Sequence, residues 1–378
     1  MVDVHRVLRF TKQYRQREKA PTVRILLTGN MGYVGPIVVQ HLRRQHPNAY
    51  LVGFDTGLFA HCLTTSTFPE VILNEQRFGD VRDITSSDLA GFDAIVHLAA
   101  VSNDPIGNKF EAVTDEINYH ASVQIARAAS TIGVRNFVFA SSCSVYGAAE
   151  TGEARTETSW INPLKAYARS KASTEAALNQ MDRQGMLVTC LRFGTACGMS
   201  DRLRLDLVLN DFVASALADG EVKVLSDGSP WRPLIDVRDM ARAIDWAIER
   251  EALCGGEFLT VNVGSERCNY RVRDIAEAVA KAIPSTRVSI NQNAQPDTRS
   301  YRVDFRLYAS LAPKHQPQVK LDQSIAAVRD GLTSLGFHDP NFRDSQFIRL
   351  RVLESHIFKQ RLRANLRWGL ESRHASVK

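Results

Sequence analysis

The sequence predicts an α/β protein built on a doubly wound parallel sheet, with a smaller α/β substrate-binding lobe. Short apolar, β-branched runs recur along the first half of the chain, as expected of buried parallel strands. They occupy residues 23–28, 50–55, 94–100, 137–142 and 187–192. Helical patterns separate most of them, for instance at 115–132 and 164–184. Strands and helices that alternate in this way indicate a parallel sheet covered on both faces, whose ligands bind beyond the carboxyl ends of the strands.

A glycine-rich turn joins the first predicted strand to its helix. Gly29, Gly32 and Gly35 follow the strand at once, and the helical pattern begins near Tyr33. Glycines at this spacing allow a tight turn, close approach of the backbone to a pyrophosphate and close helix–strand packing. The helix N-terminus favours the anionic phosphates. The strand before the turn and the helix after it therefore predict a Rossmann-type dinucleotide site.

The second predicted strand ends in an acid, Asp55. A carboxylate at this position accepts hydrogen bonds from both ribose hydroxyls and repels a 2′-phosphate. No Lys or Arg occurs between Asp55 and Ala60. The cofactor is therefore expected to be NAD rather than NADP, and the alternative is that Asp55 is only a turn residue at a strand end.

Tyr167, Lys171 and Ser142 are the candidate catalytic residues. Tyr167 and Lys171 are four residues apart and share one face of a predicted helix. An ammonium beside the phenol favours the phenolate, whose ordinary pKa is about 10. A hydroxyl such as that of Ser142, at the end of a predicted strand, can hold a substrate alcohol against this base. These groups suit proton removal from an alcohol whose carbon loses hydride, and the alternative is a Tyr–Lys pair on an exposed helix face.

Over roughly residues 22–340, the chain resembles the extended short-chain dehydrogenase/reductase family, in particular its nucleotide-sugar epimerases and dehydratases. Besides the residues above, the resemblance rests on segments that occur in the family's order. These are Gly79-Asp80-Val81, His97-Leu98-Ala99-Ala100, Asn118, Ser141-Ser142, Val145-Tyr146-Gly147, Arg232 to Asp239 and Val261 to Gly264.

The resemblance implies roles for individual residues. The implied NAD-binding set, which also includes Tyr167 and Lys171, is Gly29, Gly32, Tyr33, Val34, Gly35, Asp55, Asp80, Val81, Leu98, Ala99, Ala100 and Asn118. Asp80 and Val81 would contact adenine, and Asn118 would brace the helix beside the active site. The implied substrate-binding set is Ser102, Asn103, Ser142, Thr195, Arg232 and Arg299. Both arginines would bind the substrate diphosphate unless they are solvated surface charges. No metal site is expected.

The residues near Ser142 discriminate among the family's reactions. Dehydratases and decarboxylases of the family carry an acid within two positions of the active-site hydroxyl, whereas Cys143 and Ser144 follow here. The 3,5-epimerase/reductase branch pairs a Cys with a downstream His, whereas this chain has Ser200 there, so Cys143 is interpreted as a packing residue. We therefore predict an NAD-dependent nucleotide-sugar 4-epimerase that forms a transient 4-keto sugar. The alternatives are a dehydrogenase or reductase, or another transient-oxidation enzyme such as a dehydratase or an isomerase/mutase. Family epimerases commonly carry Asn at the position of Thr195. This difference leaves open a substrate with a less common sugar.

Composition and charge define the expected organisation. The 378 residues carry a net charge of +6, and both ends are basic. We expect a basic extension at 1–21, an NAD-binding domain at 22–200, a substrate lobe at 201–340 with some strand exchange, and a basic tail at 341–378. Six cysteines without metal-site spacing and the lack of a long apolar run predict a reduced, cytoplasmic protein. No motif indicates nucleic-acid binding. The amphipathic pattern from Gln346 to Trp368 predicts docking on the protein or a subunit interface in a homodimer, and the alternative is contact with an anionic membrane.

Overall fold

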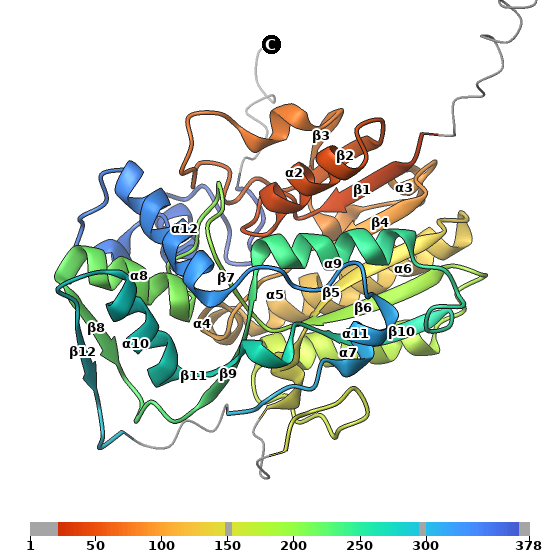
Figure 1. Cartoon of the computed structure of the whole chain (residues 1–378). Helices are drawn as coiled ribbons and strands as arrows, with labels where there is room; N and C mark the ends of the chain where they lie inside the picture. The colour runs from red at the N-terminus through yellow and green to blue at the C-terminus, as the bar shows by residue number, and fades with distance from the viewer. Residues whose placement is uncertain (1–21, 148–152, 295–299, 370–378) are drawn as a thin grey trace, which may run out of the picture.

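A seven-stranded parallel sheet forms the centre of the protein (Figure 1). The computed structural model describes residues 22–147, 153–294 and 300–369. From edge to edge the strands are β10 (Phe258–Val263), β6 (Leu187–Phe193), β5 (Asn136–Ser142), β4 (Ala94–His97), β1 (Arg24–Thr28), β2 (Tyr50–Asp55) and β3 (Glu75–Phe78). The direction of winding reverses between β1 and β4, and such a switch point opens a crevice at the carboxyl ends of the strands. The predicted doubly wound sheet is confirmed.

Helices cover both faces of this sheet and produce two cores. Alternate residues of a strand point to opposite faces, so Ile25 and Leu27 pack with α2 (Gly35–Gln45) and α9 (Val237–Glu249). Leu26 packs on the other face with α6 (Ser122–Thr131). All three side chains are fully buried, and each contributes about 1.5–3 kcal/mol of hydrophobic stabilisation. Because β1 is buried on both faces, its sequence is a continuous apolar run.

The predicted helix over 115–132 is interrupted. The chain forms α5 (Glu111–Asp115), then a π-helical turn at Glu116–Ala121, and only then α6. A wider turn of this kind is rare and is frequently found at functional sites. The remaining helices around the main sheet are α3 (Ser86–Leu89), α4 (Asp104–Lys109), α7 (Ala166–Gln180) and α11 (Arg306–Leu311).

The second lobe contains two small sheets and three longer helices. The strands are β7 (Thr195–Cys197), β9 (Trp231–Asp236) and β11 (Asn269–Arg271) in one sheet, and β8 (Glu221–Val224) with β12 (Arg287–Ile290) in the other. The helices are α8 (Val208–Asp219), α10 (Val272–Ala282) and α12 (Leu321–Ser334). Since α9 and β10 return to the main sheet, the chain after residue 200 contributes to both lobes.

The C-terminal segment folds back onto the first lobe. Helix α13 (Arg349–Phe358) contacts α4, and Leu362 and Trp368 then form an antiparallel bridge. Leu353 and Leu362 are buried in a cluster with Val101. The amphipathic pattern at the end of the sequence thus corresponds to a segment docked on its own chain. None of the helices in the described ranges has the length and apolar character needed to cross a membrane.

Candidate active site

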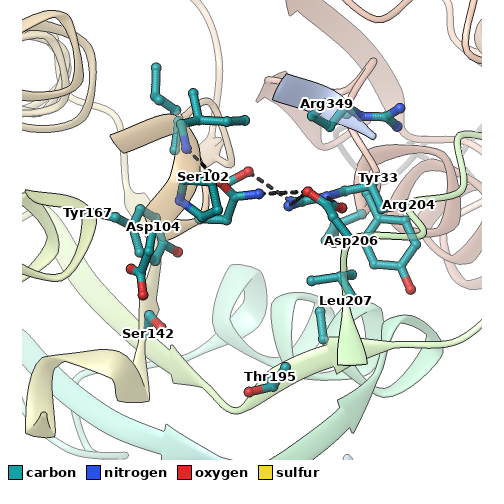
Figure 2. Close-up of a pocket in the computed structure, with 18 of the residues that line it drawn as sticks. Tyr33, Ser102, Asp104, Ser142, Tyr167, Thr195, Arg204, Asp206, Leu207 and Arg349 are labelled. Atoms are coloured by element: carbon teal, nitrogen blue, oxygen red, sulfur yellow. Dashed lines mark hydrogen bonds and ion pairs between the residues drawn. The ribbon is translucent and has the colours of Figure 1, made fainter. Parts of the chain in front are cut away.

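A cavity of about 980 Å³ lies at the carboxyl ends of the central strands. Its walls come from the glycine-rich turn, the ends of β2, β4 and β5, the start of α7, the second lobe and the C-terminal segment. Figure 2 shows Tyr167 and Ser142 on one side and Tyr33, Arg204 and Arg349 on the other. This is the position at which ligands bind in doubly wound sheets.

The glycine-rich turn occupies the cavity wall as the sequence predicts. Gly29 has φ = +76°, and a Cβ there would lie 2.5 Å from the Ala99 backbone nitrogen. Gly32, Tyr33 and Val34 line the cavity at the N-terminus of α2. Gly35 does not line it, but a Cβ at Gly35 would lie 2.0 Å from the Asn30 carbonyl oxygen, so this glycine permits the close packing of the helix. Only glycine suits these close approaches.

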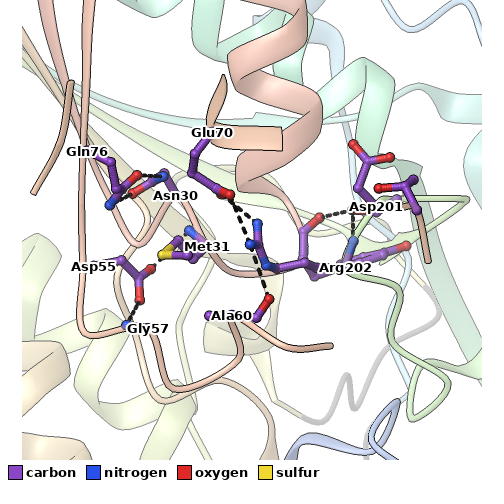
Figure 3. Close-up of polar contacts among 12 residues, drawn as sticks. Asn30, Met31, Asp55, Gly57, Ala60, Glu70, Gln76, Asp201 and Arg202 are labelled. Carbon is purple, nitrogen blue, oxygen red and sulfur yellow. Dashed lines mark hydrogen bonds and ion pairs between the residues drawn. The ribbon is translucent and has the colours of Figure 1, made fainter. Parts of the chain in front are cut away.

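Asp55 lies at the end of β2 with its carboxylate in the cavity wall (Figure 3). One oxygen accepts a hydrogen bond from the Met31 backbone nitrogen at 3.0 Å, and the other accepts one from Gly57 nitrogen at 2.8 Å. Burial raises the pKa of Asp55. The neighbouring Arg202 is paired with Glu70 at 2.6 Å, so its charge is already compensated. The arrangement suits ribose hydroxyls and does not favour a 2′-phosphate.

Most of the other predicted cofactor-binding residues also reach the cavity. Asp80, Val81, Leu98, Ala99 and Ala100 line it. The Asp80 carboxylate is paired with Arg82 at 2.6 Å.

Asn118 does not line the cavity. It lies fully buried in the π-helical turn, accepts a hydrogen bond from Val101 nitrogen at 2.7 Å and donates one to Ser170 Oγ at 3.1 Å. Because Ser170 lies on α7 beside Lys171, Asn118 ties the loop after β4 to the helix that carries the candidate base.

Ser142, Tyr167 and Lys171 converge in the cavity. Ser142 lies at the end of β5 and Tyr167 lies in the first turn of α7, and both residues line the cavity. Burial raises the pKa of Tyr167, while the Ser142 side chain opposes this shift. Lys171 Nζ donates to the Ala140 carbonyl oxygen at 2.6 Å and lies 5.7 Å from the centre of the Tyr167 ring. Burial lowers the pKa of Lys171 to about 7.

These positions correct one expectation. The sequence predicts an ammonium beside the phenol and hence a lowered pKa for Tyr167, whereas the pKa is raised in this structure. The spacing of four residues does place both side chains on one helix face, but Lys171 is held by a strand carbonyl. Desolvation of the phenol is therefore the dominant effect on Tyr167.

The interpretation of Cys143 and Ser200 agrees with their surroundings. Cys143 is fully buried and donates its thiol hydrogen to the Arg192 carbonyl oxygen at 3.2 Å, and burial raises its pKa. Ser200 donates to the Tyr33 carbonyl oxygen at 2.6 Å. Neither residue lines the cavity. The Cys–His type of proton exchange thus has no counterpart next to Tyr167.

Ser102 and Asn103 line the cavity, where they hold a buried ion pair from the second lobe. Arg204 Nε lies 2.9 Å from Asp206 Oδ1. Arg204 also donates to Ser102 Oγ at 2.8 Å, and Asn103 donates to Asp206 Oδ2 at 2.6 Å (Figure 2). Asn103 has φ = +81° and caps α4 as well. The loop thus places both residues in the cavity wall, and their binding of substrate stays a prediction.

The sequence analysis missed Asp104, Arg204, Asp206 and several C-terminal residues that line the cavity. Asp104 belongs to the loop after β4, and its charge acts on Tyr167. The sequence pattern shows no acid within two positions of Ser142. The Asp104 carboxylate lines the same cavity from the loop after β4. An Arg-x-Asp pair in a connecting segment has no distinctive pattern, so no sequence signal could have identified Arg204 and Asp206.

The predicted substrate residues Thr195 and Arg232 line the cavity from β7 and β9. They lie across from the glycine-rich turn, in the lobe expected to hold substrate. Arg299 lies outside the described residues. Within the described ranges, no group of His, Cys, Asp and Glu side chains is arranged to hold a metal ion.

Comparisons with known proteins agree with this geometry. Residues 25–264 match the sequence model of the NAD dependent epimerase/dehydratase family. An uncharacterized UDP-glucose epimerase of Bacillus subtilis is 27% identical over 252 residues, which cover 64% of this chain and 77% of that protein. UDP-glucuronic acid decarboxylase 6 of Arabidopsis thaliana is 24% identical over 319 residues, which cover 82% of this chain and 88% of that protein.

Solved structures show the same fold. The UDP-glucuronic acid 4-epimerase from Bacillus cereus, solved in complex with UDP-glucuronic acid and NAD, is similar with a TM-score of 0.70 at 22% identity. The match covers 83% of this chain and 100% of that one. Family match, fold and site geometry agree with one another. The chain therefore belongs to the NAD-dependent epimerase/dehydratase family of extended short-chain dehydrogenases/reductases.

Proposed function

We propose that the protein is a nucleotide-sugar 4-epimerase that oxidises C4 to a ketone and reduces it again from the opposite face. The observation that carries the proposal is the composition of the cavity. Ser142 and Tyr167 line it together with the cofactor-binding residues, while Cys143 and Ser200 do not. Ser142 and Tyr167 are equipped to remove and return the hydroxyl proton, and bound NAD would accept and return the hydride.

The residues present fit NAD. The glycine turn provides a backbone surface without side chains, which a Cβ would obstruct. Asp55 would hold the adenosine ribose, Val81 and Asp80 would lie near adenine, and Tyr33 and Val34 would present the helix N-terminus to the diphosphate. When bound, NAD supplies the hydride acceptor and a positively charged ring near the base.

The chain's own groups handle the proton. Ser142 would orient the C4 hydroxyl toward Tyr167, which would take its proton as the carbon loses hydride. Because burial raises the pKa of Tyr167, the phenolate needs nearby positive charge. Arg204 supplies some of it, since its charge lowers the pKa of Tyr167. Lys171, with a pKa near 7, can exchange a proton at neutral pH.

The substrate would extend toward the second lobe. Arg232 and Thr195 lie on that side of the cavity and would bind the diphosphate, for which an Arg side chain offers charge-assisted hydrogen bonds. Ser102 and Asn103 would contact the sugar, with Arg204 and Asp206 holding them in place.

Asp104 favours a second candidate, a dehydratase. A carboxylate whose charge acts on Tyr167 is placed to assist the loss of a hydroxyl from the 4-keto sugar. Replacement of Asp104 by Asn separates the two functions, because elimination would lose its acid while epimerisation would keep Ser142 and Tyr167.

The test is incubation of the purified protein with UDP-, GDP-, dTDP- and CDP-sugars, followed by separation and mass measurement of the products. We expect a product of unchanged mass with no net NADH at about 340 nm, and a 10²- to 10⁴-fold lower rate for Tyr167→Phe. Loss of about 18 Da would establish the dehydratase, and stoichiometric NADH would establish a dehydrogenase.

A further inference from the structure

Residues 362–368 form a compact hairpin over the side of the cavity that is expected to hold adenosine. Leu362 and Trp368 are bridged in antiparallel fashion, and Arg363 nitrogen donates to Arg367 oxygen at 2.8 Å. The hairpin places Leu366 in the cavity wall. Leu366 is 2% exposed and has φ = +57°, a left-handed conformation that such a residue rarely adopts. An uncommon backbone conformation that presents a buried apolar side chain to a ligand cavity indicates a specific role for this turn.

Three contacts attach the hairpin to the strand ends that carry the predicted adenosine ligands. Arg367 forms a two-pronged ion pair with Asp83, which follows Asp80 and Val81. Arg82 donates to the Asn365 carbonyl oxygen at 2.9 Å.

The third contact comes from Trp368. Its indole nitrogen donates to the carbonyl oxygen of Thr56 at 2.7 Å, and Thr56 directly follows Asp55 and lines the cavity. The hairpin thus lies across the carboxyl ends of β2 and β3, next to the three residues expected to bind ribose and adenine, which are Asp55, Asp80 and Val81.

Helix α13 contributes a buried cation to the same wall. Arg349 is 2% exposed and lines the cavity. Its guanidinium donates to Arg202 oxygen at 2.7 Å and lies 4.8 Å from the centre of the Phe59 ring. No ion pair joins Arg349 to a carboxylate among the described residues, and Asp206, whose charge acts on it, is already paired with Arg204. An anion in the cavity would therefore compensate its charge more fully. A dinucleotide diphosphate is such an anion.

From these contacts we propose that residues 349–368, here called the C-terminal clasp, are part of the NAD site and hold the cofactor in place during turnover. Leu366 closes the adenosine side, and Arg349 adds positive charge for the diphosphate. Release of NAD requires the hairpin to separate from Asp83 and Thr56. A clasped cofactor returns its hydride to the sugar that supplied it, whereas an exchangeable one would leave as NADH. The inference requires NAD binding and holds for any of the reactions above.

The experiment measures the exchange of bound NAD for isotopically labelled NAD, in full-length protein without sugar substrate. The bound cofactor is released with acid and its label quantified by mass spectrometry. Asp83→Arg and Arg367→Asp each place like charges opposite each other. Since Asp83 is 60% and Arg367 35% exposed, we expect each to accelerate exchange by roughly 5- to 10-fold.

The paired variant D83R/R367D restores opposite charges and should exchange NAD within about twofold of the wild-type rate. Lys314→Ala, an exposed change outside the clasp and the cavity, should have the wild-type rate. Leu366→Ala should accelerate exchange without any change of charge. Circular dichroism establishes that each variant is folded. Folded single variants that exchange NAD at the wild-type rate, or a wild-type protein that exchanges it within seconds, would overturn the proposal. The readout does not depend on which sugar reaction is correct.

Discussion

Replacement of Glu175 by Ala should destabilise the protein by about 3–5 kcal/mol, the range observed when one partner of a buried ion pair is removed. Glu175 lies on α7 and accepts hydrogen bonds from Arg192 at 2.6, 3.0 and 3.1 Å, and both side chains are about 7% exposed. Ser141 also donates to it at 2.5 Å. The variant leaves the Arg192 guanidinium in the interior with only neutral partners such as Tyr146.

The assay is urea unfolding followed by intrinsic fluorescence. The matched control is Arg306→Ala. Arg306 forms an ion pair with Asp304 but is 82% exposed, so this variant should lose less than about 1 kcal/mol of unfolding free energy. The double variant Glu175→Ala/Arg192→Met also removes the buried guanidinium, so it should be more stable than Glu175→Ala alone. A loss as small as that of the control, or simple additivity in the double variant, would refute the reasoning.

The same change should alter catalysis. Glu175 and Ser141 connect α7 to β5, so their hydrogen bond helps to align Tyr167 with Ser142. The Glu175 charge also opposes the lowering of the Lys171 pKa by burial. Without that charge, the pKa of Lys171 falls further, and any activity that needs its ammonium should decline at a lower pH than in the wild type.

Three further predictions concern the site and its surroundings. Ser142→Ala should lower the catalytic rate by 10-fold or more with NAD still bound, because a hydrogen bond to a charged group contributes about 1.5–3 kcal/mol. Initial rates and cofactor content measure this effect, and an unchanged rate would remove Ser142 from the mechanism. Asp55→Asn should weaken NAD binding by roughly 10-fold and reduce discrimination against NADP in equilibrium titrations, whereas an unaltered NAD affinity would contradict the ribose assignment. The pKa of His46 is raised by its hydrogen bond to Asp245 at 2.6 Å, so its stabilisation is full below about pH 6.5 and is lost as pH rises through the folded pKa. Unfolding measured from pH 5 to 9 should show this loss in the wild type and not in Asp245→Asn.

The positions of the expected cofactor-binding residues in the cavity wall could be predicted from the sequence because they follow from local chain geometry. Gly29 and Gly32 lie within one turn between a strand and its helix, and Asp55 ends the next strand, so parallel pairing alone brings them together. Ser142 and Tyr167 were predicted for the same reason, since a strand end and the following helix meet at one edge of the sheet.

Other parts of the site depend on contacts between distant segments. Whether Lys171 approaches the phenol or a carbonyl depends on packing against β5, and the structure places it at Ala140. The charges of Asp104 and Arg204 act on Tyr167 from loops that are far apart in sequence, and their types and spacing resemble ordinary surface charges.

The sequence by itself determined the parallel sheet and the place of the glycine-rich turn, and it predicted that Ser142 and Tyr167 lie together in one cavity. These depend on alternating apolar burial and on glycines whose requirement is local. The tertiary structure decided the pKa direction of Tyr167, the acid that faces it and the destination of the basic C-terminus. Each of these depends on the distance and burial of groups brought together only by folding, and a pattern of residue types does not specify such distances.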